Sequence, residues 1–200
     1  EMLKIPGSFA YVRQQEPAGL GHAVWCARHL VGNEPVAVIL ADDLITGSNT
    51  IKEMISNYSS GNMLAIMDVN NQDVSSYGII SPGKTLENNM TEILGLIEKP
   101  SIDKAPSNMA VVGRYIIEPS VFNELEKQNR GTSNEIQLTD AIANRIGKSH
   151  CYGYKFTNDR FDCGSKLGFI QANIKLSIER DDLSEKLKSW LKDEFLNGDV

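Results

Sequence analysis

Short apolar runs alternate with segments of helical spacing along the chain, and this alternation limits the fold more than any other feature. Residues 36–40 form an unbroken apolar run, which is typical of a strand buried on both faces of a sheet. Residues 64–69 and 110–117 continue the strand signals, with helical patterns between the runs. The sequence therefore predicts an α/β fold in which a mixed sheet has helices on both faces.

The other expected elements follow from local signals of the same kind. Thr50 with Glu53 three residues later forms a capping-box pattern at the start of a helix. Pro82 and Gly83 mark a turn. We expect residues 1–200 to form a single domain that ends in an amphipathic helix at about 183–196. Further strands are expected at 9–12, 77–80, 93–97 and 152–156, and further helices at 20–31, 119–127, 136–146 and 167–178.

Composition and charge exclude several classes of protein. The 200 residues carry 20 basic and 26 acidic side chains, and a net charge of −6 disfavours binding to nucleic acid. No apolar run approaches the ~18 residues of a membrane helix, and no signal-peptide pattern is seen. Three cysteines without a C-x-x-C pair indicate neither a disulfide framework nor a zinc knuckle. We expect a soluble, cytoplasmic protein that binds neither nucleic acid nor membrane.

Polar clusters follow the predicted strands, where ligands bind in open α/β sheets. Residues 14–23, Q-Q-E-P-A-G-L-G-H-A, open a helix; the glycines let the backbone approach a ligand, and amide side chains can pair with a base edge. Asp42 and Asp43 offer hard oxygen ligands for Mg²⁺. Taken alone, a glycine-rich segment like the first cluster is more often only a turn. For the second cluster, a carboxylate that caps the next element is an equal alternative.

A third cluster, Glu98-Lys99-Pro100, pairs opposite charges at the end of a strand. Pro100 favours an extended backbone before it, so we expect Glu98 and Lys99 to point to opposite sides. The carboxylate is then suited to sugar hydroxyls and the ammonium to phosphate, whereas a solvated ion pair is the alternative. Asp162 precedes Cys163-Gly164 between a strand and a helix, where it is either a second metal ligand or a helix N-cap.

These clusters belong to an ordered set of motifs that extends over residues 9–178. In chain order the motifs are Q-Q-E-P-A-G-L-G-H-A, A-D-D-L-I, Y-G-I-I, L-I-E-K-P, A-P-S-N-M-A-V-V-G-R-Y, N-E-I-Q-L-T-D-A-I and F-D-C-G-S-K-L-G. The set resembles the bacterial type of UTP glucose-1-phosphate uridylyltransferase, also called UDP-glucose pyrophosphorylase. The resemblance implies a Rossmann-like, glycosyltransferase-A-like nucleotidyltransferase domain. Such a domain makes UDP-glucose and pyrophosphate from UTP and glucose 1-phosphate with Mg²⁺.

The resemblance also implies roles for individual residues. Gln14 and Gly19 match positions that read the uracil edge and lie against the base. Asp42 matches the metal-binding aspartate, with Asp162 as the second ligand, and Lys99 matches the phosphate-binding lysine. Asp42 and Lys99 are thus the expected catalytic residues, and Asp42 also contributes to nucleotide binding. The positions matched around glucose are Gly78, Glu98, Gly113 and Tyr115.

The implied mechanism is a single in-line displacement, in which an oxygen of glucose 1-phosphate attacks the α-phosphorus of UTP and pyrophosphate leaves. Positioning and charge neutralisation supply the rate, without a covalent enzyme intermediate. His22 is expected to order the glycine-rich turn rather than to act as a base. The apolar stripe of the last helix either packs on its own domain or meets another subunit, and the residues alone favour neither. The resemblance favours a homodimer or homotetramer. The stripe consists of Leu183, Leu187, Trp190, Leu191 and Phe195.

One family feature has no match in this sequence. The family opens with a strand and a glycine-rich loop, G-x-G-T-R, followed by a lysine and P-K-E-M, which cradles the triphosphate. We therefore expect the domain to be incomplete at its N-terminus, and no turnover from these residues alone. Two alternatives to the uridylyltransferase stay open: a thymidylyltransferase acting on the same sugar phosphate, and a catalytically silent sugar-nucleotide-binding or assembly subunit.

Overall fold

The computed structural model describes residues 9–127 and 134–195, which fall into two compact units. The large unit comprises Glu1–Ile39 and Thr50–Phe156, and the small unit comprises Leu40–Asn49 and Thr157–Val200. Each unit is described by itself below. The single domain expected over residues 1–200 stays a prediction.

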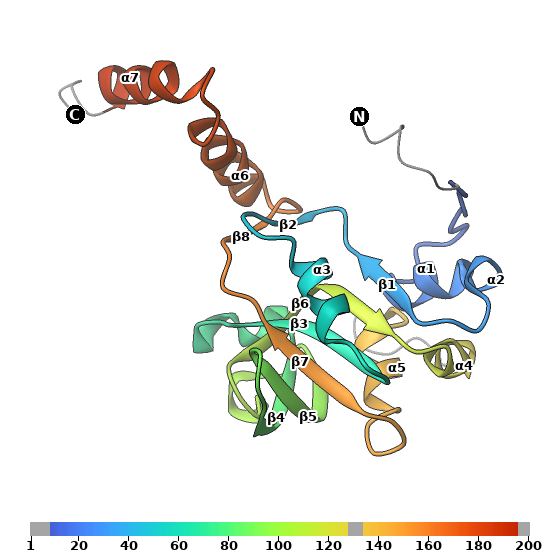
Figure 1. Cartoon of the computed structure of the whole chain (residues 1–200). Helices are drawn as coiled ribbons and strands as arrows, with labels where there is room; N and C mark the ends of the chain where they lie inside the picture. Colours follow the sequence, from blue (N-terminus) through green and yellow to red (C-terminus); the bar gives the residue numbers. More distant parts are fainter. Residues whose placement is uncertain (1–8, 128–133, 196–200) are drawn as a thin grey trace. The chain divides into compact units, whose positions relative to one another are not determined.

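Within its described residues, the large unit contains a six-stranded sheet with the strand order β1-β6-β3-β7-β5-β4 (Figure 1). The pair β3–β7 is parallel and the neighbouring pairs are antiparallel, so the predicted mixed sheet is confirmed. The strands are β1 (Val36–Ile39), β3 (Asn62–Asp68), β4 (Gly78–Thr85), β5 (Met90–Glu98), β6 (Met109–Ile117) and β7 (Cys151–Lys155).

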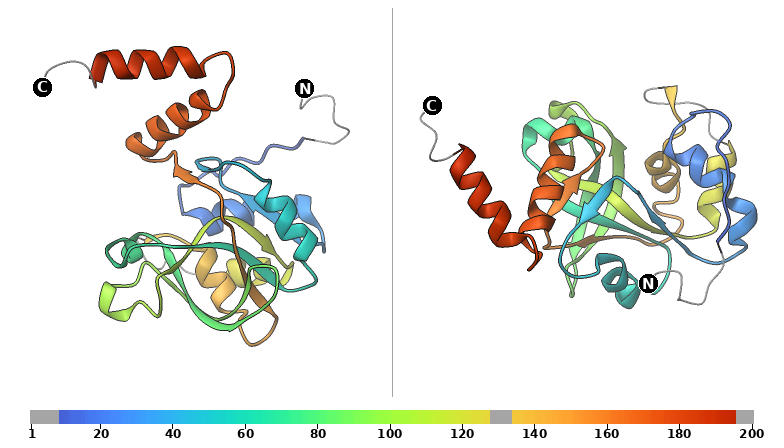
Figure 2. Two further views of the ribbon diagram at one scale, coloured as in Figure 1. Left: turned by 60° about the vertical axis from the view of Figure 1, so that its left-hand side comes forward. Right: turned by 90° about the horizontal axis from the view of Figure 1, so that it is seen from above.

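Helices lie on both sides of this sheet, as predicted (Figure 2). Helices α1, α4 and α5 contact one another, and α5 packs against β5. Helix α3 lies on the other side, where its Met54 is fully buried, while Leu138 and Ile142 of α5 are buried on theirs. The helices are α1 (Leu20–Cys26), α2 (Arg28–Val31), α3 (Thr50–Asn57), α4 (Ser120–Lys127) and α5 (Leu138–Ala143), with short 3-10 turns at η2 (Asn71–Ser76) and η3 (Ile102–Lys104).

The centre of the sheet is its most buried part. The first five residues of β3 are all buried, in line with the continuous apolar run in the sequence. Fully burying one such aliphatic side chain contributes about 1.5–3 kcal/mol. The rigid core that positions the loops of the large unit therefore lies around β3 and β6.

Two strand predictions near the N-terminus are wrong. β1 is not buried on both faces: its residues alternate between half-buried and exposed, and Ile39 is 53% exposed. The reason is that β1 lies at the edge of the described sheet, beside β6. Residues 9–12 form no strand, and Tyr11 is 95% exposed, because no described strand pairs with this segment.

Two predictions from local signals, the capping box at Thr50 and the turn at Pro82 and Gly83, are also wrong. The Thr50 Oγ1 atom is buried without a hydrogen-bond partner among the described residues, so the predicted capping box does not form. Glu53 instead accepts a hydrogen bond from the Tyr154 hydroxyl at 2.9 Å. Pro82 and Gly83 lie inside β4, where the register with β5 shifts after Ser81. A bulge rather than a turn accommodates this proline, because β4 is the last strand in the sheet order.

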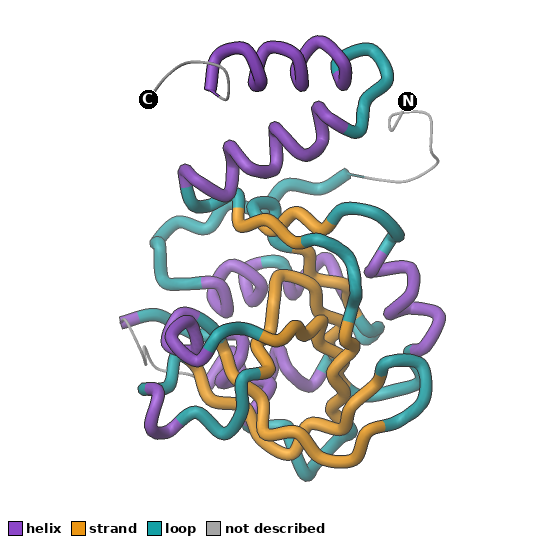
Figure 3. Tube along the Cα trace, turned by 90° about the vertical axis from the view of Figure 1, so that its left-hand side faces the viewer, coloured by secondary structure: helices purple, strands orange, loops and turns teal. Residues whose placement is uncertain are grey.

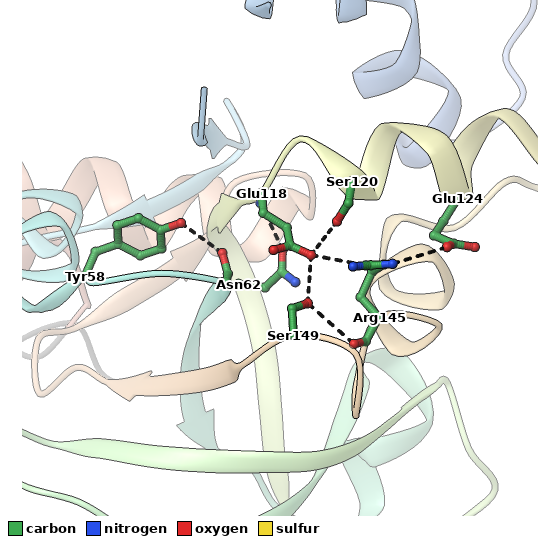
Figure 4. A network of polar contacts seen from close by, with 8 residues as sticks. Tyr58, Asn62, Glu118, Ser120, Glu124, Arg145 and Ser149 are labelled. Carbon is green, nitrogen blue, oxygen red and sulfur yellow. Dashed lines mark hydrogen bonds and ion pairs between the residues drawn. The ribbon is translucent and has the colours of Figure 1, made fainter. Parts of the chain in front are cut away.

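A polar network joins the end of β6 to the loop before β7 (Figure 4). Glu118 Oε1 accepts hydrogen bonds from Arg145 Nε at 3.1 Å, from Ser149 Oγ at 2.7 Å and from the Ser120 hydroxyl. The backbone N–H of Glu118 donates to Asn62 Oδ1 at 3.0 Å. Burial raises the pKa of Glu118, but these donors outweigh burial and the pKa lies below its usual value.

The small unit pairs two three-residue strands, β2 (Asp43–Ile45) and β8 (Arg160–Asp162), and ends in two helices that lie side by side (Figure 3). The helices are α6 (Lys166–Ile178) and α7 (Ser184–Phe195), close to the expected positions. The side chain of Ser165 caps α6 by accepting from the Gly168 N–H at 3.0 Å, so Asp162 is not the cap.

Among the described residues, no helix has both the length and the apolar character needed to cross a membrane.

Candidate active site

The loop before α1 is held by the segment that precedes α5. Gly21 N–H donates to the Ile136 carbonyl at 2.9 Å, and Ile136 N–H donates to the Ala18 carbonyl at 2.7 Å. Gly19 has φ +97°, and a Cβ placed there would lie 2.7 Å from the Glu135 Cβ. A Cβ at Gly21 would lie 2.7 Å from the Ile136 carbonyl oxygen. Both glycines are therefore required by this close packing, and Gly19 also by its left-handed backbone.

The predicted base-reading residues lie together in this loop. Gln14 Nε2 donates to the Gly19 carbonyl at 3.0 Å and lies 3.0 Å from His22 Nδ1. His22 thus makes contacts inside the turn, in agreement with the ordering role predicted for it. The loop presents a half-buried amide side chain beside glycine backbone, an arrangement suited to the edge and face of a planar base.

The predicted sugar-binding carboxylate is held on β5 by two neighbours. Thr139 Oγ1, at the start of α5, donates to Glu98 Oε2 at 2.7 Å. Gly78 pairs with Glu98 across β4 and β5, and a Cβ at Gly78 would lie 3.1 Å from Glu98 Oε2 and 3.0 Å from Thr139 Cγ2. Gly78 therefore leaves room for the Glu98–Thr139 hydrogen bond. Thr139 lies in the N-E-I-Q-L-T-D-A-I motif, but neither the motif nor the resemblance predicts a role for it.

The prediction that Glu98 and Lys99 point to opposite sides is wrong. Lys99 Nζ lies 3.9 Å from Glu98 Oε1. The backbone of Lys99 has φ +46°, in the left-handed region, so Pro100 does not hold it extended. Such a conformation is uncommon outside glycine and is found at functional sites. Because of it, the ammonium group lies beside the carboxylate instead of across the strand.

Burial changes the acid–base properties of Glu98, whose side chain is 10% exposed. Burial raises the pKa of this carboxyl, the Thr139 hydroxyl and Lys99 partly oppose the shift, and the charges of Asp140 and Glu135 add to it. The net direction is upward. A carboxylate in this setting is a strong hydrogen-bond acceptor for neutral hydroxyl groups, which add no further negative charge.

Gly113 and Tyr115 both lie on β6 and are buried. Tyr115 is opposite Leu64 in β3, and the next paired positions are Val111 and Ile66. Gly113 therefore lies in the irregular stretch of this strand pair, where residues 112–114 of β6 lie opposite residue 65 alone, as in a β-bulge. The roles of Gly113 and Tyr115 toward a sugar stay predictions.

The two aspartates predicted as metal ligands come together in the small unit. Asp43 is 4% exposed, and its carboxylate is bound by Arg160 at 2.7 Å (Nε to Oδ1) and 3.3 Å (Nη2 to Oδ2). Asp42 is exposed, and its carbonyl accepts from the Cys163 N–H at 2.7 Å. A Cβ at Gly164 would lie 3.0 Å from Asp42 Oδ2 and 3.1 Å from Asp162 Oδ1. The carboxylates of Asp42 and Asp162 thus flank Gly164, whereas Asp43 has a structural role.

This pair fits Mg²⁺ by its donor chemistry. The described residues contain no group of three or more His, Cys, Asp or Glu side chains that could hold a metal ion. Mg²⁺ does not need such a cage, because it is commonly bound by one or two carboxylates together with substrate phosphates and water. Asp162 Oδ1 also accepts from the Gly164 N–H at 3.0 Å, which fixes its position. Asp42 and Asp162 as magnesium ligands stay a prediction.

A cavity of about 630 Å³ in the large unit contains none of the predicted site residues. It lies near the starts of β3 and β7, with Gly61, Glu118 and Tyr152 in its lining. The candidate base and sugar site is therefore defined by the polar side chains of the large unit described above rather than by this cavity.

Comparison with known proteins agrees with the motifs. Residues 4–178 match the nucleotidyl transferase family. A UTP–glucose-1-phosphate uridylyltransferase of Staphylococcus saprophyticus is 38% identical over 91% of this chain and 64% of its own length. That of Bacillus subtilis is 37% identical, with 91% and 63% covered. The chain thus spans somewhat less than two thirds of the length of these curated relatives.

Solved structures give the same result for the fold. A UDP-glucose pyrophosphorylase complexed with UDP-glucose has a TM-score of 0.81 and 42% identity, covering 86% of this chain and 67% of its own. The UTP-bound enzyme of Acinetobacter baumannii has a TM-score of 0.81 and 35% identity, covering 92% and 65%. The expected α/β fold of the nucleotidyltransferase type is confirmed. The resemblance read from the motifs is confirmed as well, and the chain belongs to the nucleotidyl transferase family.

Proposed function

We propose that the protein transfers a uridylyl group from UTP to glucose 1-phosphate and so produces UDP-glucose and pyrophosphate. One observation carries the proposal: residues 135–139 hold both halves of the candidate site. Ile136 binds the backbone of the Gln14–Gly19 loop, and Thr139 binds the carboxylate of Glu98. A base-binding loop and a hydroxyl-binding carboxylate fixed by one short segment suit a ligand that joins a base to a sugar. The relatives described above support uridine and glucose as its parts.

The residues fit an in-line displacement. Glu98 accepts hydrogen bonds from sugar hydroxyls, and Lys99 beside it binds phosphate. An oxygen of the sugar phosphate attacks the α-phosphorus of the nucleotide, the bond to the β-phosphate breaks, and pyrophosphate takes the electron pair. Asp42 and Asp162 would hold Mg²⁺, which supplies charge neutralisation for the phosphates. Substrate positioning by the fixed loop and by Glu98 provides the remaining rate enhancement.

The decisive assay follows pyrophosphate release from UTP in the presence of Mg²⁺, with and without glucose 1-phosphate. In a chain that includes the family's glycine-rich loop, we expect release that depends on both substrates and stops when EDTA removes the metal. Residues 1–200 by themselves are expected to give no turnover. Binding of UDP-glucose without release would favour the catalytically silent sugar-nucleotide-binding subunit. Faster release from dTTP than from UTP would favour the thymidylyltransferase, since thymine and uracil share the pairing edge that Gln14 faces.

We also propose that the protein forms a homodimer or homotetramer through α6 and α7. Both helices carry exposed large apolar side chains, and Trp190 is 53% exposed. Patches of this kind are uncommon on monomers and are covered by association with a second copy. The cytoplasm is the proposed location, supported by the free thiols of Cys26, Cys151 and Cys163.

A further inference from the structure

We propose that His22 Nδ1, together with the Gly19 carbonyl, fixes the orientation of the Gln14 side-chain amide, so that the base loop presents a hydrogen-bond acceptor to a pyrimidine. His22 is thereby a specificity-determining positioning residue. The inference rests on the proposed function, because it concerns how the same loop chooses its base.

The orientation of the amide follows from its neighbours. The Gly19 carbonyl can only accept, so the Gln14 atom 3.0 Å from it is the Nε2 donor. The same Nε2 lies 3.0 Å from His22 Nδ1. An amide nitrogen carries two hydrogens, and these two neighbours take one each. His22 Nδ1 is therefore the acceptor, and the ring proton lies on Nε2.

The rest of α1 keeps the imidazole ring in this state. His22 Nε2 lies 3.8 Å from the Cys26 Sγ, a weak acceptor for the ring proton. The ring stacks on Trp25 with centroids 5.9 Å apart and planes 20° apart. The guanidinium of Arg28 lies 3.5 Å from the centre of the Trp25 ring and anchors that indole. The acceptor at Nδ1 is thus preorganised before any ligand binds.

This arrangement leaves Gln14 Oε1 as the atom available for a ligand. Among the described residues Oε1 makes no hydrogen bond, whereas both amide hydrogens are engaged. Uracil presents an N3–H donor at its pairing edge, and cytosine presents a lone pair at N3. An acceptor at Oε1 therefore favours uracil and opposes cytosine. Without the acceptor of His22, one of the two hydrogen bonds that hold the amide is lost, so the amide can turn and present its Nε2 donor to cytosine.

The test compares two variants of His22 by their specificity for UTP over CTP. His22→Phe keeps an aromatic ring against Trp25 but removes the acceptor, and His22→Asn keeps an acceptor oxygen close to the position of Nδ1. We expect His22→Phe to lower the ratio of kcat/KM for UTP over CTP about tenfold, with a larger change in KM than in kcat. His22→Asn should keep most of the ratio. Equal ratios in wild type and His22→Phe, or equal losses in both variants, would overturn the proposal.

Two further measurements keep the inference independent of folding and of turnover. If the protein binds but does not turn over, titration with UDP-glucose and CDP-glucose measures the same ratio, so failure of the proposed reaction leaves the proposal testable. If His22→Phe does not fold, a ¹⁵N spectrum of the wild-type histidine rings decides. We expect the unprotonated nitrogen of His22 to be Nδ1, and a proton on Nδ1 at neutral pH would overturn the proposal.

Discussion

At the scale of single residues, Glu98 combines a proposed sugar-binding role with an unfavourable environment for its charge. Burial, together with Asp140 and Glu135, raises the pKa of its carboxyl in the folded protein. Between the ordinary and the raised pKa, the folded state binds more protons than the unfolded chain. The contribution of Glu98 to the free energy of unfolding is therefore most favourable at low pH. This contribution is lost as the pH rises through the raised pKa.

Replacing Glu98 with Gln removes this penalty while keeping an acceptor for Thr139. We expect Glu98→Gln to raise the free energy of unfolding at pH 7, with the gain shrinking as the pH falls toward about 4, where an ordinary glutamate also becomes neutral. Thermal unfolding of wild type and variant over a pH series measures this. A variant that is less stable than the wild type at pH 7 would contradict the assigned cause.

The neighbouring aspartates Asp42 and Asp43 are proposed to have different roles, so their Asn variants should change different properties of the protein. Asp43→Asn breaks the buried pair with Arg160 and should cost about 3 kcal/mol of stability. Asp42→Asn changes an exposed side chain, so stability should stay within about 0.5 kcal/mol while the Mg²⁺-dependent rate falls on the order of 100-fold. Chemical denaturation and steady-state rates test both, and the reverse pattern would exchange the two assignments.

Residue roles were predictable in part. The motifs pointed to Gln14 and Glu98 as candidates because both belong to short local patterns, and their roles toward a ligand stay predictions. Thr139 was missed as an individual partner because its contact with Glu98 joins positions far apart in the chain. The direction of the Lys99 side chain relative to that of Glu98 was mispredicted. The left-handed backbone of Lys99 depends on the surrounding fold rather than on Pro100.

At the scale of elements, the network around Glu118 ties α4, β6 and the loop before β7 together. Glu118→Gln weakens hydrogen bonds that depend on a charged acceptor and should lower the free energy of unfolding by about 1–3 kcal/mol. Glu124→Gln is the matched control, since Glu124 Oε1 lies 3.7 Å from Arg145 and contributes less. Equal losses in urea denaturation would show that Glu118 has no special role.

Elements were predictable where the pattern was long. The runs at β3, β5 and β6 span seven to nine residues, and their burial made them visible in the sequence. β2 and β8 were missed because three residues give no periodicity. Residues 9–12 have strand-like composition but no described neighbour to pair with, and composition alone does not reveal pairing.

At the scale of the whole molecule, the proposed assembly through α6 and α7 can be tested without disturbing the sheet. Leu187 and Leu191 are half-buried, whereas Phe169 and Trp190 are exposed. Phe169→Glu with Trp190→Glu should therefore lower the mass measured by light scattering and leave the circular dichroism spectrum unchanged. Lys186→Glu on the same helix controls for charge. A wild-type protein that is monomeric at micromolar concentration would refute the assembly.

The central claim is that one site in the large unit binds both the base and the sugar of UDP-glucose. Calorimetric titration of wild type and Glu98→Gln with UDP-glucose and with UTP tests it most directly. We predict saturable binding of UDP-glucose by the wild type, and a loss of about tenfold in Glu98→Gln that leaves UTP binding within about twofold, because UTP lacks the glucose that Glu98 is proposed to bind. No binding of UDP-glucose by the wild type, or equal losses for the two ligands in the variant, would contradict the claim.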